Sequence, residues 1–201
     1  DDSTDKTVIP LRSVLQRLSF DDLKDKKILL VLDATGMHAN WPTGLVHNDF
    51  VRQLSTVLDE FRSKVPNLIV ISSTGIDQRS WAYDGWRGTA FGHFLAEGLK
   101  GDAVNSRGRI TALSLFERVR DHVKAWARDN RAAEQIPIML PGLEEGNTKA
   151  LAASFELAIQ TSSYSLPLPR PTELASELSG KDPKQDGQEK SERSEEHMSE
   201  L

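Results

Sequence analysis

The chain contains no cysteine among its 201 residues. Disulfide bonds, thiolate metal ligands and thiol catalysis are therefore excluded for this chain. The sequence also lacks any apolar run near the ~20 residues that a membrane-spanning helix needs, and no signal-peptide pattern opens it. We predict no membrane partner for this segment and expect a cytoplasmic protein, although the missing cysteine by itself does not fix the compartment.

A strong excess of charge of either sign is also missing. The formal net charge is -5, and hydrophobic residues make up 38% of the chain. This weak negative charge argues against nucleic acid as the main partner. The length is sufficient for one ordinary domain with a core. Because the chain opens with Asp1 and Asp2 rather than methionine, we interpret it as a piece of a longer protein.

Motifs for metals and nucleotides are absent as well. The histidines show no HExxH spacing, and no acidic loop has the pattern of a calcium site. The glycines form neither GxGxxG nor GxxxxGK[ST]. We therefore predict no metal site and no cofactor.

An aliphatic run at residues 27–33 predicts a buried strand, and it ends in Asp33, Ala34, Thr35 and Gly36. In open α/β sheets, chemistry gathers just beyond the carboxyl ends of such strands. A nucleophile would be expected among these residues, and the residue that stands there is Thr35.

Hydrophobic periodicity in the rest of the chain predicts further helices and strands. The predicted helices cover residues 10–18, 50–61 with Asn48 as N-cap, 89–99, 112–129 capped by Thr111, and 147–160. The further predicted strands cover 68–71 and 135–141, and the predicted loops cover 34–46 and 72–88. A helix between two aliphatic strands forms a βαβ unit. The fold class is therefore α/β, with a mostly parallel sheet and helices on both faces.

The order of these signals resembles the caspase and metacaspase superfamily of cysteine peptidases, especially its bacterial caspase-like members. In that family an aliphatic strand ends in Asp-Ala-Cys, where this chain has Asp33-Ala34-Thr35. Later motifs of the family correspond to Gly88-Thr89-Ala90-Phe91, Gly108-Arg109-Ile110-Thr111 and Gln135-Ile136-Pro137. The resemblance implies a three-layer caspase-like sandwich of which this chain carries a part.

Composition and the resemblance together predict three segments. Residues 1–8 are an incoming loop, and residues 9–160 are the later part of the caspase-like domain. Residues 161–201 are rich in Pro, Glu, Ser and Lys, and we predict a disordered tail because such a composition buries too little apolar surface.

The resemblance also implies that the catalytic pair is missing. The family's cysteine corresponds to Thr35, and its histidine belongs to a strand that would precede Asp1. A threonine hydroxyl is much less acidic than a thiol and needs a well-aligned base. The favoured interpretation is an inactive pseudopeptidase that binds a peptide or protein partner or acts in regulation. The alternatives are an active endopeptidase with a non-cysteine nucleophile, for which His38 or His47 could serve Thr35, and an unrelated α/β interaction module.

Three further residues are candidates for substrate binding. By resemblance, Asp33 lies where the basic-specific branch of the family holds an Arg or Lys side chain, although it could equally cap backbone N–H groups. Arg79 and Trp81 fall in the loop that borders the family's substrate groove, where a peptide adds as a strand. Ordinary loop packing is the alternative for both, and the preferred one for Trp86.

Overall fold

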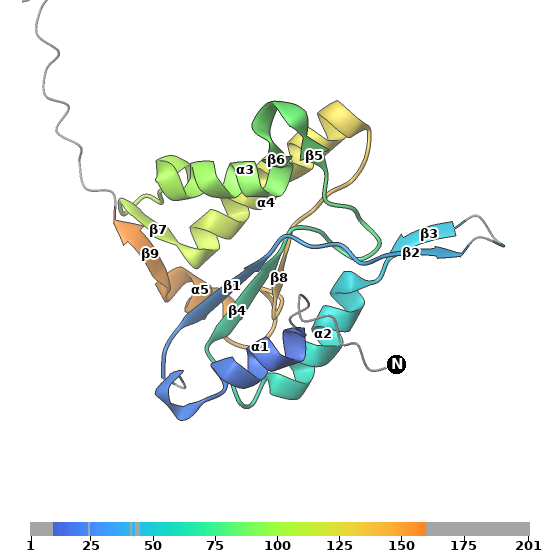
Figure 1. The fold of residues 1–201 in the computed structure, drawn as a ribbon. Helices are drawn as coiled ribbons and strands as arrows, with labels where there is room; N and C mark the ends of the chain where they lie inside the picture. Colours follow the sequence, from blue (N-terminus) through green and yellow to red (C-terminus); the bar gives the residue numbers. More distant parts are fainter. Residues whose placement is uncertain (1–9, 24, 41, 43–44, 160–201) are drawn as a thin grey trace, which may run out of the picture. The chain divides into compact units, whose positions relative to one another are not determined.

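The computed structural model describes residues 10–23, 25–40, 42 and 45–159, which belong to the unit Asp1–Thr161. The predicted incoming loop at residues 1–8 and the predicted tail at 161–201 lie outside the described residues. Figure 1 shows how the helices and strands of this unit are arranged.

Helices and strands alternate along most of the unit, as the periodicity predicted. The helices are α1 (Leu11–Leu18), α2 (Phe50–Phe61), α3 (Ala90–Glu97), α4 (Ala112–Arg131) and α5 (Thr148–Ser154), with short turns of helix at Asp21–Leu23, Asp84–Trp86 and Gly98–Asp102. The strands are β1 (Ile28–Leu32), β2 (Met37–Asn40), β3 (Leu45–Asn48), β4 (Leu68–Ser72), β5 (Ala82–Tyr83), β6 (Gly88–Thr89), β7 (Arg109–Thr111), β8 (Ile138–Leu140) and β9 (Glu156–Ile159).

A mixed sheet of strands β1, β4 and β8, in that order, forms the centre of the unit. Strands β1 and β4 are parallel, with Ile28 opposite Leu68 and Leu32 opposite Ser72. Strand β8 runs antiparallel to β4 at the edge of the sheet, a position that suits the prolines on either side of it. The α/β fold class is therefore confirmed, with one parallel and one antiparallel pairing in this sheet.

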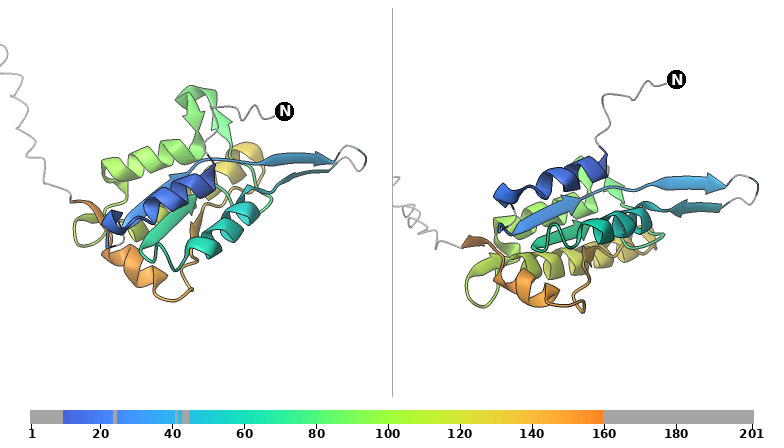
Figure 2. Two further views of the ribbon diagram at one scale, coloured as in Figure 1. Left: turned by 60° about the horizontal axis from the view of Figure 1, so that its bottom comes forward. Right: turned by 90° about the horizontal axis from the view of Figure 1, so that it is seen from below.

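Helices cover both faces of this sheet (Figure 2). Strand β4 is fully buried, and its alternate residues point to opposite faces. Leu68 and Val70 pack in a cluster with α1 and α2, whereas Ile69 and Ile71 pack in a second cluster with α3, α4 and α5. The three-layer arrangement follows from these two clusters.

Strand β1 differs from the expectation of a buried strand. All five of its residues are only half-buried. The physical reason is that β1 pairs with β4 along one edge, and no strand among the described residues pairs with its other edge.

Short β-ribbons replace several predicted loops. The expected loop at 34–46 contains strand β2 and part of β3, which pair antiparallel with His38 opposite His47. This hairpin extends beyond the end of the sheet (Figures 1 and 2). The expected helix at 147–160 stops at Ser154, because the chain then forms β9 and pairs with β7. The loop at 72–88 likewise contains β5, which pairs with β6.

No helix within the described ranges is long and apolar enough to cross a membrane.

Candidate functional site

Polar side chains gather at the carboxyl ends of β1 and β4, which the parallel pairing brings together. Asp33 follows β1 and is exposed. Its Oδ1 atom accepts a 2.8 Å hydrogen bond from the Ser80 hydroxyl, and its Oδ2 atom accepts one from the Thr89 hydroxyl. Thr89 is the N-cap of α3 and accepts a 2.9 Å bond from the Gly92 N–H. Asp33 therefore joins the strand end to the start of a helix through hydroxyl donors.

Gln135 connects further polar groups at the same edge of the sheet. Its side chain is completely buried. The Nε2 atom donates to the Ser73 carbonyl at 3.0 Å and to the Ser80 hydroxyl at 3.3 Å. The Oε1 atom accepts from the Trp81 N–H at 3.1 Å. One side chain thus holds the end of β4 and the loop before β5 in a fixed relation. In the sequence, Gln135 stands out only as part of a family motif, and no local pattern predicts this role.

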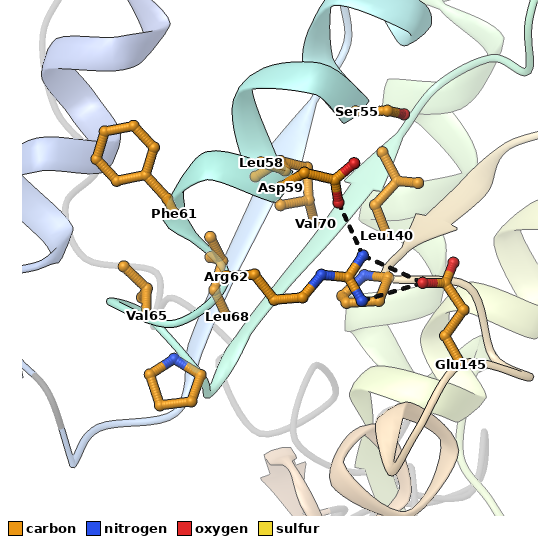
Figure 3. A pocket seen from close by; sticks show the side chains of 12 residues that line it. Ser55, Leu58, Asp59, Phe61, Arg62, Val65, Leu68, Val70, Leu140 and Glu145 are labelled. Atoms are coloured by element: carbon orange, nitrogen blue, oxygen red, sulfur yellow. Dashed lines mark hydrogen bonds and ion pairs between the residues drawn. The ribbon is translucent and has the colours of Figure 1, made fainter.

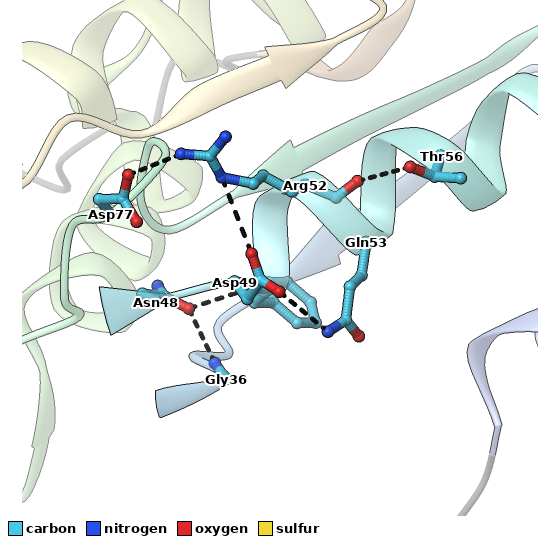
Figure 4. Close-up of polar contacts among 8 residues, drawn as sticks. Gly36, Asn48, Asp49, Arg52, Gln53, Thr56 and Asp77 are labelled. Carbon is cyan, nitrogen blue, oxygen red and sulfur yellow. Dashed lines mark hydrogen bonds and ion pairs between the residues drawn. The ribbon is translucent and has the colours of Figure 1, made fainter. Parts of the chain in front are cut away.

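Asn48 has a similar role at the base of the β2–β3 hairpin (Figure 4). It is 1% exposed, and its Oδ1 atom accepts from the N–H groups of Gly36 and Phe50 at 2.9 and 3.1 Å. Its Nδ2 atom donates to the Gln78 carbonyl at 2.5 Å. The predicted N-cap is one residue off, because α2 begins at Phe50 and its N-cap is Asp49. Asn48 instead ties the hairpin to the loop after β4.

Thr35 lies between Asp33 and this hairpin and is exposed. Among the described residues, none makes a hydrogen bond with the Thr35 hydroxyl. The side chain of His38 lies outside the described residues, and the His47 side chain is exposed. The position that resembles the family's nucleophile is therefore open to solvent, with no aligned base among the described side chains.

Trp81 is half-buried, and two guanidinium groups lie over its indole ring. The Cζ atoms of Arg79 and Arg131 lie 4.9 and 5.8 Å from the centroid of the ring. The backbone of Trp81 is fixed as well, because its carbonyl accepts from the Ala90 N–H at 2.9 Å. Arg131, at the end of α4, was not singled out by the sequence.

Trp86 packs in an aromatic cluster rather than facing this edge. Its ring stacks on His93 with a centroid distance of 3.9 Å and an interplanar angle of 2°. The rings of Phe94, Trp126 and Tyr83 surround it at 5.5, 5.3 and 5.1 Å. Loop packing, the interpretation preferred from the sequence, accounts for Trp86.

Buried polar atoms without a hydrogen-bond partner mark the same edge. Within the described part of the chain these atoms are Ser72 Oγ, Ser73 Oγ and Trp81 Nε1. Native cores leave few such atoms unpaired, since each costs free energy to desolvate. Their concentration at the end of β4 distinguishes this edge from the rest of the unit.

A separate pocket of about 190 Å³ lies between α2, β4 and β8 (Figure 3). Arg62 lies at its rim, where it donates to Asp59 at 3.0 Å and to Glu145 at 3.1 Å. A hydrogen bond from the Gly142 N–H lowers the pKa of the Glu145 carboxyl, and the hydrogen bond from Arg62 adds a smaller decrease. The apolar lining is Leu58, Phe61, Val65, Pro66, Leu68, Val70, Leu140 and Pro141. None of the four predicted site residues lines this pocket.

No group of three or more potential ligands in the described residues could hold a metal ion.

A comparison with known proteins finds similarity to a solved structure but not to a family model or a curated protein. No family model and no curated protein matches the chain. A solved structure that is similar is the crystal structure of caspase-1 from Spodoptera frugiperda. The identity is 16%, the similarity covers 64% of this chain and 65% of that chain, and the TM-score is 0.36. The chain thus spans less than two thirds of that caspase chain.

Proposed function

We propose that residues 9–160 are the later part of a caspase-like domain that binds a peptide or protein segment and lacks peptidase activity. The order and spacing of the motifs from Asp33 to Pro137 support the assignment. The polar edge at the ends of β1 and β4 supports the location of the site. A cytoplasmic location and the absence of nucleic acid and membrane partners stay predictions.

The observation that carries the loss of activity is Thr35 itself. A threonine stands where the resembling peptidases have their nucleophile, and no other residue of the chain supplies a thiol. Its hydroxyl makes no hydrogen bond to a base among the described residues. Activation of a hydroxyl requires such a base within about 2.6–3.2 Å. The described geometry therefore favours binding without cleavage.

The backbone beside Asp33 supports peptide binding. The N–H and C=O groups of Arg79 and Ser80 make no hydrogen bonds within the described residues. Unpaired backbone groups of this kind can pair with an added peptide strand. Asp33 can take part as well, since a carboxylate offers about four lone-pair positions and only two are used.

Peptide cleavage and peptide binding by the 201-residue chain test this proposal together. We expect a fluorogenic peptide library to stay uncleaved and members of an immobilised library to bind. The Thr35→Ala variant should leave both results unchanged, as should Thr56→Ala, a control on the exposed side of α2. Cleavage that Thr35→Ala abolishes and Thr56→Ala retains would establish a threonine nucleophile and refute the loss of activity.

The Thr35→Cys variant extends the test to the rest of the site. Because no aligned histidine accompanies residue 35 in the described residues, we expect the new thiol to give no cleavage. Cleavage by this variant alone would mean that a base and an oxyanion site remain in place. An absence of any bound peptide in the library would refute the binding role and favour an unrelated α/β module.

A further inference from the structure

We infer that the pocket between α2, β4 and β8 binds a small amphiphilic amine, with an apolar group inside the pocket and an ammonium group at its mouth. The pocket has a volume of about 190 Å³ and lies beside Leu68 and Val70 of β4, whereas the polar edge lies where this strand ends. None of the four predicted site residues lines the pocket. The inference therefore goes beyond the proposed peptide-binding function and does not depend on it.

The interior of the pocket is apolar. Phe61, Val65 and Leu68 form walls that are almost fully buried, and Leu58 and Leu140 line the pocket as half-buried side chains. An apolar cavity of about 150 Å³ is large enough to bind benzene. The apolar part of the ligand can therefore be as large as a phenyl ring, and its transfer from water into the pocket favours binding.

The mouth of the pocket carries an excess of negative charge (Figure 3). Asp59 and Glu145 are the carboxylates among the lining residues, and Arg62 is the cation. Arg62 donates to Asp59 Oδ1 at 3.0 Å through Nη2, and to Glu145 Oε2 at 3.1 Å through each Nη atom. Lys64 lies over the Phe61 ring and makes no ion pair with either carboxylate in the described part of the chain. Two carboxylates thus share one guanidinium group, which favours a ligand that brings a second positive charge.

Both carboxylates keep acceptor positions for an ammonium group. An ionised carboxylate offers about four lone-pair positions. Within the described residues Asp59 accepts only from Arg62, and Glu145 accepts from Arg62 and from the Gly142 N–H at 2.9 Å. The Gly142 hydrogen bond lowers the pKa of the Glu145 carboxyl, which keeps this group ionised at neutral pH. An ammonium group has three donors and no acceptor, so it matches these free positions, whereas an anionic head group would be repelled.

Contacts on both sides of the mouth hold the charged groups in place. Arg62, the C-cap of α2, joins this helix to Glu145 in the loop after β8. The Gly142 N–H fixes the other oxygen of the same carboxylate. Since the acceptors are held before a ligand arrives, little conformational entropy opposes binding.

An NMR titration of the 201-residue chain with phenethylamine tests this inference. The matched probes are phenethyl alcohol, which has a neutral head group, and hydrocinnamate, which has an anionic one. We expect phenethylamine to shift the methyl signals of Leu58, Val65 and Leu140 in a saturable manner. It should bind about 5-fold more tightly than the alcohol, as an exposed ion pair allows. Hydrocinnamate should bind more weakly than the alcohol.

Variants of the pocket locate the site and the source of the preference. Asp59→Asn combined with Glu145→Gln should remove the preference for the amine over the alcohol. Glu60→Gln should keep it, because this exposed carboxylate of α2 pairs with Arg12 and does not line the pocket. Leu58→Phe, which places a larger side chain in the pocket, should weaken binding of all three probes. If Leu58→Phe does not fold, the substitutions at the exposed carboxylates carry the test.

The contrary outcomes are equally specific. Equal affinity for the amine and the alcohol would overturn the cationic head group, and tighter binding of hydrocinnamate would assign the head group to Arg62 instead. Shifts that do not saturate, or that lie away from the pocket, would overturn the site itself. A preference that Glu60→Gln also removes would indicate an effect of overall charge and overturn the inference. None of these results bears on the peptide-binding measurements, which concern the other end of β4.

Discussion

The Ser80 hydroxyl donates a hydrogen bond of 2.8 Å to the Oδ1 atom of Asp33. Forty-seven residues separate the two in sequence, and the bond joins the end of β1 to the loop after β4. Thr89 completes the arrangement through the second carboxylate oxygen. Asp33 is therefore a structural acceptor that holds the two segments together at this edge of the sheet.

Replacement of Thr89 tests the structural role of this network. Thr89→Ala removes the N-cap of α3 and one donor to Asp33, so we expect a loss of about 1–2 kcal/mol in the free energy of unfolding. Thr89→Ser keeps a hydroxyl that can make both bonds and should recover most of the loss. Urea denaturation of the 201-residue chain measures both values. Equal destabilisation by Ala and Ser would contradict the hydrogen-bonding role.

Gln135 allows a second prediction, since it is buried and bonds to three groups of the edge. Gln135→Met is similar in size but leaves the Ser73 carbonyl and the Trp81 N–H without partners. We expect a loss of about 2–6 kcal/mol in the free energy of unfolding, from ~1–3 kcal/mol for each of the two orphaned groups. The matched control is Gln53→Met on the exposed side of α2, for which a change within about 0.5 kcal/mol is expected. Similar changes in both variants would refute the importance of burial here.

Much of the layered fold followed from the sequence. The period of apolar residues placed α1, α2 and α4 within about two residues of their observed bounds, and Thr111 caps α4 as predicted, with Ser114 completing a capping box. The parallel pairing of β1 with β4 followed from the helix between them. These features depend on local patterns of apolar residues, which are visible in a single sequence.

The short ribbons and the polar network could not be predicted in the same way. Strands β2, β5 and β6 have two to four residues each, too few for a period to be recognised. The roles of Asn48 and Gln135 depend on contacts with residues 30 and 62 positions away in sequence. Buried amides of this kind have no local pattern, although an isolated Gln before an apolar strand is a weak sign.

The conformation of Gly101 supports a third prediction. Its φ angle is 136°, a value that side chains disfavour, while no atom lies within 4 Å of a Cβ placed there. Gly101→Ala should therefore destabilise the chain by about 1–2 kcal/mol through backbone strain alone. Gly88→Ala is the control, because its φ is not positive and the nearest atom lies at 3.8 Å. The urea denaturation midpoints of the two variants test this prediction. An unchanged midpoint for Gly101→Ala would contradict the strained conformation.

The ion pair of Asp102 and Arg118 supports a prediction about pH. Arg118 donates through Nε and Nη2 at 2.8 Å each, and these hydrogen bonds lower the pKa of the Asp102 carboxyl. The folded state therefore releases this proton more readily than the unfolded state does. The resulting stabilisation is complete above the ordinary pKa of about 3.9 and is lost as the pH falls through the lowered value.

Urea denaturation of the natural chain and Asp102→Asn between pH 7 and pH 2 measures this effect. At neutral pH the variant should be less stable by about 0.5–1 kcal/mol, the range for an exposed pair with good geometry. The difference should shrink as the pH falls through the lowered pKa, because the carboxyl then becomes protonated in the folded as well as in the unfolded state of the natural chain. Asp84→Asn, at a carboxylate with no ion pair among the described residues, should show no comparable difference. A stability difference between the natural chain and Asp102→Asn that stays constant down to pH 2 would show that packing, and not charge, makes the contribution.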